Sequence, residues 1–207
     1  MKKFLKVLGI LAILAILAAV FVAVIILLTP WMDRWGATDA EVNATFPGDE
    51  LVTAPASFVN RTVTIEASPE EIYPWLLQLG ADKGGLYSYT AFEGLINCPM
   101  TNADRIHEEW QGLEIGDEVK MCVTGPAPPP YIVAQILPNE ALVMGHQENG
   151  EWVDLWQFIL VPQSDQSTRL ILRTRTMMVG GFWDIIHPGV FVMERGLLLG
   201  VKERAEK

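Results

Sequence analysis

The chain begins with an apolar run that limits its possible folds more than any other part of the sequence. From Val7 to Leu28 it contains 22 residues without a charged or strongly hydrogen-bonding side chain. As a helix rising about 1.5 Å per residue, this run is about 33 Å long, which is enough to cross the hydrocarbon core of a bilayer. The sequence therefore predicts a transmembrane anchor within residues 1–30, a polar linker over 31–56 and one domain over 57–207.

The residues on either side of the run indicate its orientation. Three lysines precede it, whereas Asp33 and Arg34 follow it and cancel each other. Because positive residues remain on the cytoplasmic side, we expect a single-pass membrane protein with a cytoplasmic N-terminus and an extracytoplasmic domain. A cleaved signal peptide is the alternative, but its apolar region has about 7–15 residues and ends in a small-x-small cleavage site. The present run is longer and lacks that ending, so we favour the anchor.

Charge and cysteine content narrow the possible partners. The chain carries a formal charge of −10, and an acidic domain is a poor ligand for polyanions, so no nucleic-acid partner is expected. The only cysteines are Cys98 and Cys122, and whether they pair is left open by their spacing alone. The histidines and cysteines show no metal-binding spacing, so we expect neither a metal nor a cofactor.

Hydrophobic periodicity beyond residue 57 predicts an alternation of short elements and a final long helix. The segment 58–67 alternates as a half-buried strand does. In "SPEEIYPWLLQLG", Ser68 and Glu71 form a capping box, so a helix begins there. Five apolar segments between 117 and 178 are separated by short turns, which favours consecutive antiparallel strands. The tail has an apolar stripe at helical spacing, formed by Phe182, Ile186, Val190, Met193 and Leu197.

This order predicts an α+β fold. The long C-terminal helix has to bury its apolar stripe, and a face of the antiparallel sheet is the available partner. A curved antiparallel sheet wrapped around such a helix need not close at its centre, so we expect an apolar cavity between helix and sheet.

The same ordered segments resemble the START-like, or SRPBCC, helix-grip superfamily, which includes Bet v 1-like and polyketide cyclase/dehydratase-like proteins. The resemblance covers residues 57–205 and is greatest to uncharacterised bacterial members. It implies a helix-grip fold. It implies no single activity, because members bind lipids, sterols, hormones or aromatics and only some are enzymes. The segments that carry it are "VTIEASPEEIYPWLLQLG", "GGLYSYTAFEGL", "NADRIHEEWQGLEIGDEV", "WQFILVP", "TRLILRTR" and "HPGVFVMERGLLLGVKERAE".

The stretch "GGLYSYTAFEG" (84–94) allows three interpretations. It lacks the glycine and lysine spacing of a phosphate loop. As a catalytic loop it offers Glu93, whose pKa burial would raise, but spacing identifies no catalytic partner, and a hydrogen bond from Arg105 or from backbone amides is the simpler expectation. As a cavity rim it fits better, because Tyr87 and Tyr89 combine an apolar ring with a hydroxyl. Simple packing below the helices is the remaining alternative.

Alternation along the last two long strands separates an inner face from an outer face. Trp152, Asp154, Trp156 and Phe158 share one parity, whereas an arginine row on the next strand is expected to face outward and to pair with acids. Asp154 therefore has inward parity, either in water at a strand end or as a polar anchor in the cavity.

These observations predict a membrane-anchored domain that binds a small hydrophobic ligand, lipid- or isoprenoid-like, between the C-terminal helix and the sheet. One alternative is a cyclase/dehydratase-type enzyme with Glu93, Tyr87 or Asp154 as acid or base. The other is a structural or interaction domain whose cavity has closed. The sequence does not indicate the oligomeric state. The expected ligand-binding residues are Tyr87, Tyr89, Phe92, Glu93, Trp156, Phe158, Leu172, Thr174, Ile186, Val190 and Met193.

Overall fold

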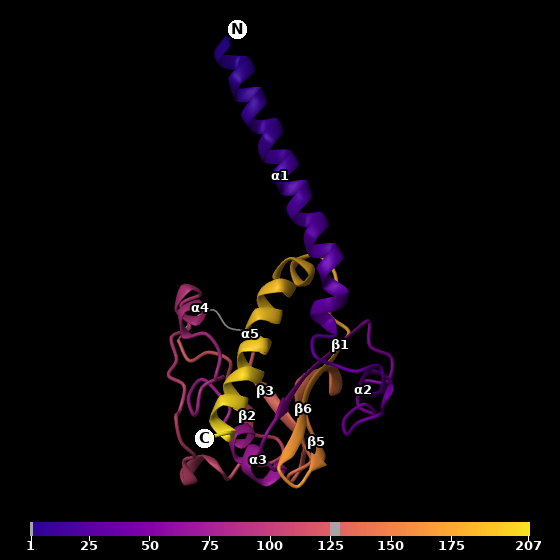
Figure 1. Cartoon of the computed structure of the whole chain (residues 1–207), viewed down its shortest axis with the longest axis vertical. Helices are drawn as coiled ribbons and strands as arrows, with labels where there is room; N and C mark the ends of the chain where they lie inside the picture. Colours follow the sequence, from indigo (N-terminus) through magenta and orange to yellow (C-terminus); the bar gives the residue numbers. More distant parts are fainter. Residues whose placement is uncertain (1, 125–128) are drawn as a thin grey trace.

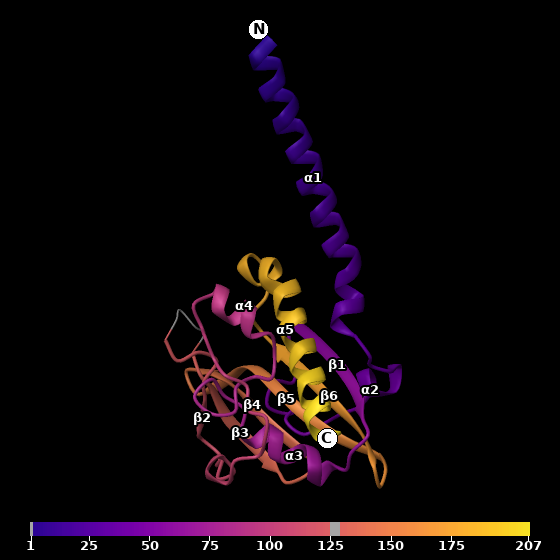
Figure 2. The same cartoon turned by 60° about the vertical axis from the view of Figure 1, so that its left-hand side comes forward.

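The computed structural model describes residues 2–124 and 129–207, and Figures 1 and 2 show a long helix projecting from an α+β domain. The described elements are α1 (Lys2–Asp33), α2 (Asp39–Asn43), β1 (Ser57–Ile65), α3 (Pro69–Leu77), α4 (Thr90–Leu95), the 3-10 helix η1 (Glu108–Trp110), β2 (Glu118–Val119), β3 (Tyr131–Leu137), β4 (Ala141–Glu148), β5 (Glu151–Ser164), β6 (Ser167–Thr176) and α5 (Phe182–Ala205).

Helix α1 contains the apolar run and continues without interruption into the domain (Figure 1). In the part of the chain that the structure describes, Gly9–Asp33 is the one stretch long and apolar enough to cross a membrane, and none of its most apolar 18-residue window is buried by the domain. Length and composition are the grounds for this assignment. A signal sequence near the N-terminus has the same two properties.

The strands form one antiparallel sheet in the order β1-β6-β5-β4-β3-β2. Strands β2 to β6 pair in sequence order, as the short turns predict, and β1 pairs with β6 along its whole length. Strand β2 has only two residues and is shorter than its sequence pattern suggests. This arrangement places the first and last strands side by side and leaves β5 at the centre.

A bulge in the β4–β5 pair changes one assignment of sheet face. The register shifts between His146 and Gln147, so Trp152 lies opposite Gln147 while Asp154 lies opposite His146. The one extra residue in β5, between Trp152 and Asp154, reverses the alternation of side chains. Trp152 therefore packs with the outer-face residue Leu155. The expectation that Trp152 shares a face with Asp154 is therefore wrong, whereas the parity of Asp154, Trp156 and Phe158 is confirmed.

The inner face of the sheet is covered by α3 and by the second half of α5. Leu197, Leu198 and Val201 of α5 are almost fully buried in the same cluster as Phe158 and Leu172 of the sheet. Burial of each such side chain contributes about 1.5–3 kcal/mol, so the stripe holds α5 against the sheet. The α+β class, with a six-stranded antiparallel sheet and a long C-terminal helix, is confirmed.

The outer face is covered by the stretch that the sequence suggests as a linker. Phe46 packs on Ile159 and Ile171, and a second cluster joins Val52 to Val143 and Leu155. A sheet with apolar residues on both faces needs cover on both. The segment between α1 and β1 provides the cover for this face.

The arginine row of β6 lies under this cover and pairs with acids, as expected. Arg169 bonds Glu41 at 2.7 Å, and Arg173 bonds Asp49 at 2.6 Å. Arg173 is only 1% exposed, and its guanidinium also lies over the ring of Phe46. The acids that neutralise the row thus come from the segment before β1.

The two cysteines, whose pairing the sequence leaves open, form a disulfide. Cys98 and Cys122 lie with their Cα atoms 5.3 Å apart. The bond joins the turn that follows α4 to the segment that follows β2, two regions with little regular structure of their own.

Candidate ligand-binding cavity

A cavity of about 180 Å³ lies between the first half of α5 and the inner faces of β1, β5 and β6. Its lining residues Val179 and Trp183 are exposed, so the cavity is open to solvent where β6 leads into α5. Its apolar wall is formed by Val59 together with Met178, Val179, Trp183, Ile186 and Val190.

A buried ion pair lies deepest in this cavity. Arg61 of β1 is 1% exposed, and its Nη1 donates to Oε2 of Glu194 in α5. The other oxygen of Glu194 accepts a hydrogen bond of 3.0 Å from the indole of Trp156 in β5. Burial lowers the pKa of the Arg61 guanidinium to about 10, opposed by the charge of Asp33, so the group remains charged at neutral pH. The pair joins α5 to two strands.

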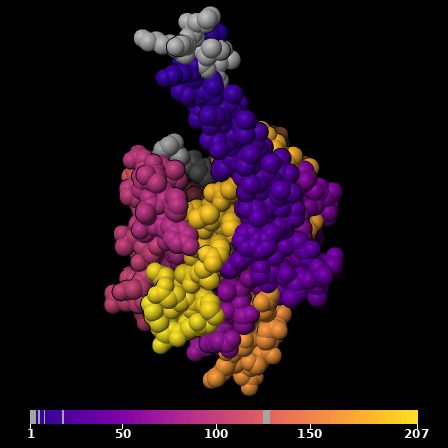
Figure 3. All heavy atoms as spheres, turned by 45° about the horizontal axis from the view of Figure 1, so that its top comes forward, coloured from indigo at the N-terminus to yellow at the C-terminus, as the bar shows by residue number. Residues whose placement is uncertain are grey.

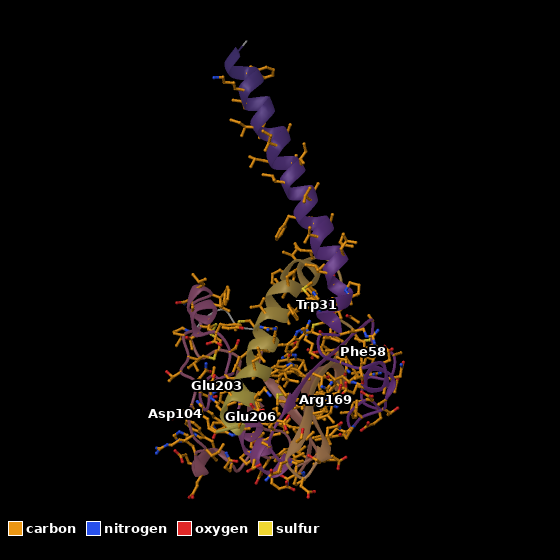
Figure 4. The ribbon with its side chains drawn as sticks, in the orientation of Figure 1. Trp31, Phe58, Asp104, Arg169, Glu203 and Glu206 are labelled. Carbon is orange, nitrogen blue, oxygen red and sulfur yellow. A yellow bond between two sulfur atoms is a disulfide. The ribbon has the colours of Figure 1, made fainter. Side chains whose placement is uncertain are left out.

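The last turn of α1 is bonded to the same cluster. Nε of Arg61 donates to the carbonyl oxygen of Met32 at 2.8 Å, and Nε2 of His187 lies 2.7 Å from Oδ1 of Asp33. Trp31 packs edge-on against Phe191 of α5. Figure 4 shows Trp31 at the foot of α1, next to α5. The apolar helix is thus attached to the cavity wall without an intervening flexible segment.

Three residues that line the cavity each have one buried polar atom without a hydrogen-bond partner among the described residues. The atoms are Nη2 of Arg61, Oγ1 of Thr174 and Nδ1 of His187, and Nη2 of Arg61 has an ion-pair contact of 3.9 Å with Asp33. Buried polar groups in proteins are normally paired, and an unmade hydrogen bond costs about 1–3 kcal/mol. Their presence on one wall indicates a place where a polar group of a bound molecule would be stabilised.

Asp154 lies at the cavity wall and pairs with His146. Its Oδ1 accepts from both the backbone N–H and the Nδ1 of His146, each at 2.8 Å. The other ring nitrogen lies 2.9 Å from the carbonyl oxygen of Pro129. Burial alone would lower the pKa of His146, but these bonds and the charge of Asp154 outweigh it and raise the pKa. Both ring nitrogens face acceptors, so the arrangement favours the doubly protonated imidazolium.

The structure brings part of the sequence-predicted site together. Thr174, Ile186 and Val190 line the cavity, and so does Asp154. Trp156 adjoins it through Glu194, while Phe158 and Leu172 are buried in the core beneath. Met193 is half-buried, and its backbone carbonyl accepts from Ser88.

Residues 84–89 of this stretch lie elsewhere, along the second half of α5. Tyr87 and Tyr89 line a separate and more polar pocket of about 290 Å³ together with Gly196 and Gly200. Figure 3 shows this segment against α5, on the side away from α1. Phe92 is exposed at the surface of α4. The tyrosines expected at the rim therefore do not line the cavity between α5 and β1.

Tyr87 is held by several contacts at once. Its backbone has a φ of 52°, a region that side chains rarely adopt, and its N–H donates to Oδ1 of Asn102 at 2.8 Å. Its hydroxyl donates to the carbonyl of Trp75 at 3.0 Å, and burial raises its pKa. Gly200 of α5 approaches it so closely that an added Cβ would lie 2.0 Å from its carbonyl oxygen. Tyr87 thus positions the stretch against α5.

The environment of Glu93 differs from the expectation. The side chain is 1% exposed, but neither carboxylate oxygen has a hydrogen-bond partner among the described residues. The expected bonds from Arg105 or from backbone amides are therefore wrong. Burial without a partner raises the pKa of Glu93.

Arg61 and Glu194 were not identified from the sequence. Arg61 has the same parity as Val59 and Val63 in its strand, and Glu194 follows Val190 by four residues on the apolar stripe. The sequence signal that could have identified them is a charged residue at a position whose pattern predicts burial, positive in the strand and negative in the helix. Nothing in the sequence connects the two positions, which are 133 residues apart.

No family model and no curated protein sequence matches this chain. Several solved structures align with its domain. The Aha1 dimer from Colwellia psychrerythraea is 20% identical over 72% of this chain and 96% of its own, with a TM-score of 0.45. CalC, a self-sacrificing resistance protein from Micromonospora echinospora, is 12% identical over 72% and 94%, with a TM-score of 0.44. KanY is 12% identical over 73% and 98%, with a TM-score of 0.46. At these values, the function has to be argued from the residues of the chain itself.

Proposed function

We propose that this protein is a membrane-anchored, helix-grip binding domain that holds a small amphipathic molecule between α5 and the sheet. The main support is the cavity, whose lining combines apolar side chains with three residues that each have a buried polar atom without a hydrogen-bond partner among the described residues. Binding sites for small molecules combine these features, an apolar lining with a few convergent polar groups.

The polar atoms suggest the chemistry of the ligand. Arg61 is already neutralised by Glu194, and Asp154 and Asp184 also line the cavity, so a second negative charge would be poorly stabilised. A hydroxyl or carbonyl group can accept from Arg61 and Thr174 without adding charge. We therefore expect a neutral alcohol, ketone, ester or quinone-like head group.

The volume limits how much of the ligand enters. An engineered cavity of about 150 Å³ in another protein binds benzene, so about 180 Å³ accommodates one ring or one short branched chain. A longer isoprenoid or acyl chain would leave its remainder at the open end, beside the start of α5.

The disulfide and the predicted anchor both bear on which side of the membrane the domain lies. Disulfides persist in oxidising compartments outside the cytoplasm. Cys98 and Cys122 pair in the domain, and the lysines that precede α1 favour a cytoplasmic N-terminus. Both support an extracytoplasmic domain.

The test is native mass spectrometry of the full chain released from lipid nanodiscs. Wild type is expected to retain a bound small molecule. Val190→Trp, which fills the cavity, should lose it, whereas Val192→Trp places the same side chain at an exposed position of the same helix and should keep it. A wild-type protein that never carries a ligand, or equal retention by the two variants, would contradict the proposal.

An acid–base enzyme of the cyclase/dehydratase type is the second candidate, favoured by one observation. Of Glu93, Tyr87 and Asp154, Asp154 alone lines the cavity, and its hydrogen bond to His146 fixes its orientation. If an activity is found, Asp154→Asn should abolish it and Glu93→Gln should leave it unchanged. The reverse result would rule out this assignment.

A further inference from the structure

An apolar surface gathers at the end of the domain from which α1 projects. It consists of two segments, residues 177–185 at the start of α5 and residues 92–96 of α4, which we call the apolar face. Ile185 is 77% exposed and Leu95 is 81% exposed, values like the 78% of Leu27 within the apolar run of α1. Figures 1 and 2 both place α4 and the first turn of α5 at this end, with α5 between α4 and the foot of α1. Large apolar side chains that are exposed together at one end of a domain indicate an interaction surface.

The position of this face relative to α1 is fixed by contacts. Arg61 bonds the carbonyl of Met32, and His187 bonds Asp33, so the domain cannot swing freely about the end of the helix. Phe191, which packs on Trp31, lies nine residues after Phe182, or about 13 Å along a helix. The start of α5 therefore extends from the level of Trp31 towards the lipid-facing part of α1.

The composition of the apolar face favours a lipid surface as its partner over a charged molecule. Neither 177–185 nor 92–96 contains a lysine or arginine, so attraction to anionic groups contributes nothing. Their acids are Asp184 and Glu93, and the carboxylate of Glu93 is turned away from water. Phe182, Trp183 and Phe92 supply aromatic rings of the kind that settle at a membrane interface.

The cavity opens at the same place. Met178, Val179 and Trp183 belong both to the apolar face and to the cavity wall. Gly180 and Gly181 join β6 to α5 with positive φ angles of 81° and 57°, and a Cβ added to either would meet nothing within 4 Å. A ligand entering past this turn would come from whatever medium covers the apolar face.

We infer that the apolar face docks on the bilayer that α1 spans, so that the cavity opens onto lipid and takes its ligand directly from the membrane. This inference rests on the proposed anchoring and ligand binding. It adds the orientation of the domain and the route of the ligand, and it names neutral lipid as the partner.

The test uses the full chain in phosphatidylcholine nanodiscs, with a nitroxide label on single added cysteines and the Cys98–Cys122 bond left intact. Four positions are compared: Ile185 and Leu95 on the apolar face, Ile16 within α1 and Glu203 near the opposite end of α5. Figure 4 shows Glu203 far from α1. Collision rates with oxygen, which partitions into lipid, and with a water-soluble nickel chelate report the depth of each label.

We expect labels at Ile185, Leu95 and Ile16 to favour oxygen and the label at Glu203 to favour the nickel chelate. Replacing part of the lipid with phosphatidylserine should not move the labels at Ile185 and Leu95 deeper into the bilayer, because the apolar face has no basic side chains. Labels at Ile185 and Leu95 as accessible to nickel as Glu203, with Ile16 in lipid, would overturn the docking while leaving the anchor intact. A water-exposed label at Ile16 would overturn both. If the labels at Ile185 and Leu95 lie in lipid but the protein never retains a ligand, the docking of the apolar face is supported and the proposed ligand binding is contradicted.

Discussion

The ring of Trp31, in the last turn of α1, contacts the ring of Phe191 in α5 edge-on, with 5.3 Å between the centroids. The contact joins the apolar helix to the helix that forms one wall of the cavity. Phe191 also lies under the guanidinium of Arg61, 5.2 Å from its ring centroid. A change at this junction thus affects both the anchor and the cavity.

Phe191→Ala should destabilise the domain. The side chain is 7% exposed, and removing a buried phenylalanine costs about 3–5 kcal/mol because a cavity remains. Thermal unfolding in detergent should show a clear loss for Phe191→Ala. The matched change Val192→Ala, at the exposed next position, should lie within about 0.5 kcal/mol of wild type. Similar losses in the two variants would contradict the packing described here.

Glu194→Leu should be more harmful than removal of both charges. It leaves Arg61 buried without its partner, which costs about 3–5 kcal/mol, whereas the double variant Arg61→Met with Glu194→Leu avoids the isolated charge. Denaturant titration of the single and double variants measures the difference. A double variant less stable than Glu194→Leu would show that the pair is not the dominant interaction.

Gly200→Ala should destabilise, although alanine is the better helix former. The new Cβ would lie 2.0 Å from the carbonyl oxygen of Tyr87, and a backbone atom cannot move away cheaply, so we expect a cost of about 1–3 kcal/mol. Gly189→Ala meets nothing within 4 Å and should gain about 0.5–1 kcal/mol from helix propensity. Unfolding midpoints that move in the same direction would refute the close approach of Tyr87 to α5.

Glu93→Gln should stabilise the protein at neutral pH. Burial raises the pKa of Glu93 in the folded state above its ordinary value of 4.5, so the folded state loses stability as pH rises from 4.5 through the raised value. Glutamine removes this loss, with an expected gain of about 1 kcal/mol at pH 7 that shrinks towards pH 4. The exposed Glu140 provides the control, since Glu140→Gln should show no such pH-dependent gain.

His146 should make stability fall as pH rises. Its folded-state pKa is raised above 6.5, so its contribution is complete below pH 6.5 and is lost as pH rises through the folded value. Wild type should therefore lose stability between pH 6 and pH 8.5 relative to His146→Gln, which cannot take up the proton. A difference between the two proteins that does not change with pH would mean that the imidazolium is not the form held by Asp154 and Pro129.

The sequence predicted the elements well and the cavity only in part. Local signals sufficed for the capping box of Ser68 and Glu71, which the structure confirms, and for the period of the strands and of α5. Thr174, Ile186 and Val190 were placed at the cavity because strand parity and helical spacing fix which side of an element a residue occupies. Parity failed at Trp152, since the strand sequence does not reveal the bulge in β5 between Trp152 and Asp154.

The sequence by itself determined that this chain has a long apolar helix, an antiparallel sheet and a final helix with one apolar stripe, because hydrophobic period and capping act within a few residues. Only the tertiary structure decided that Arg61 meets Glu194, that Cys98 meets Cys122, and that residues 84–89 lie along the second half of α5. Such pairings depend on which distant segments are brought together when both faces of the sheet are covered. No local period records that choice.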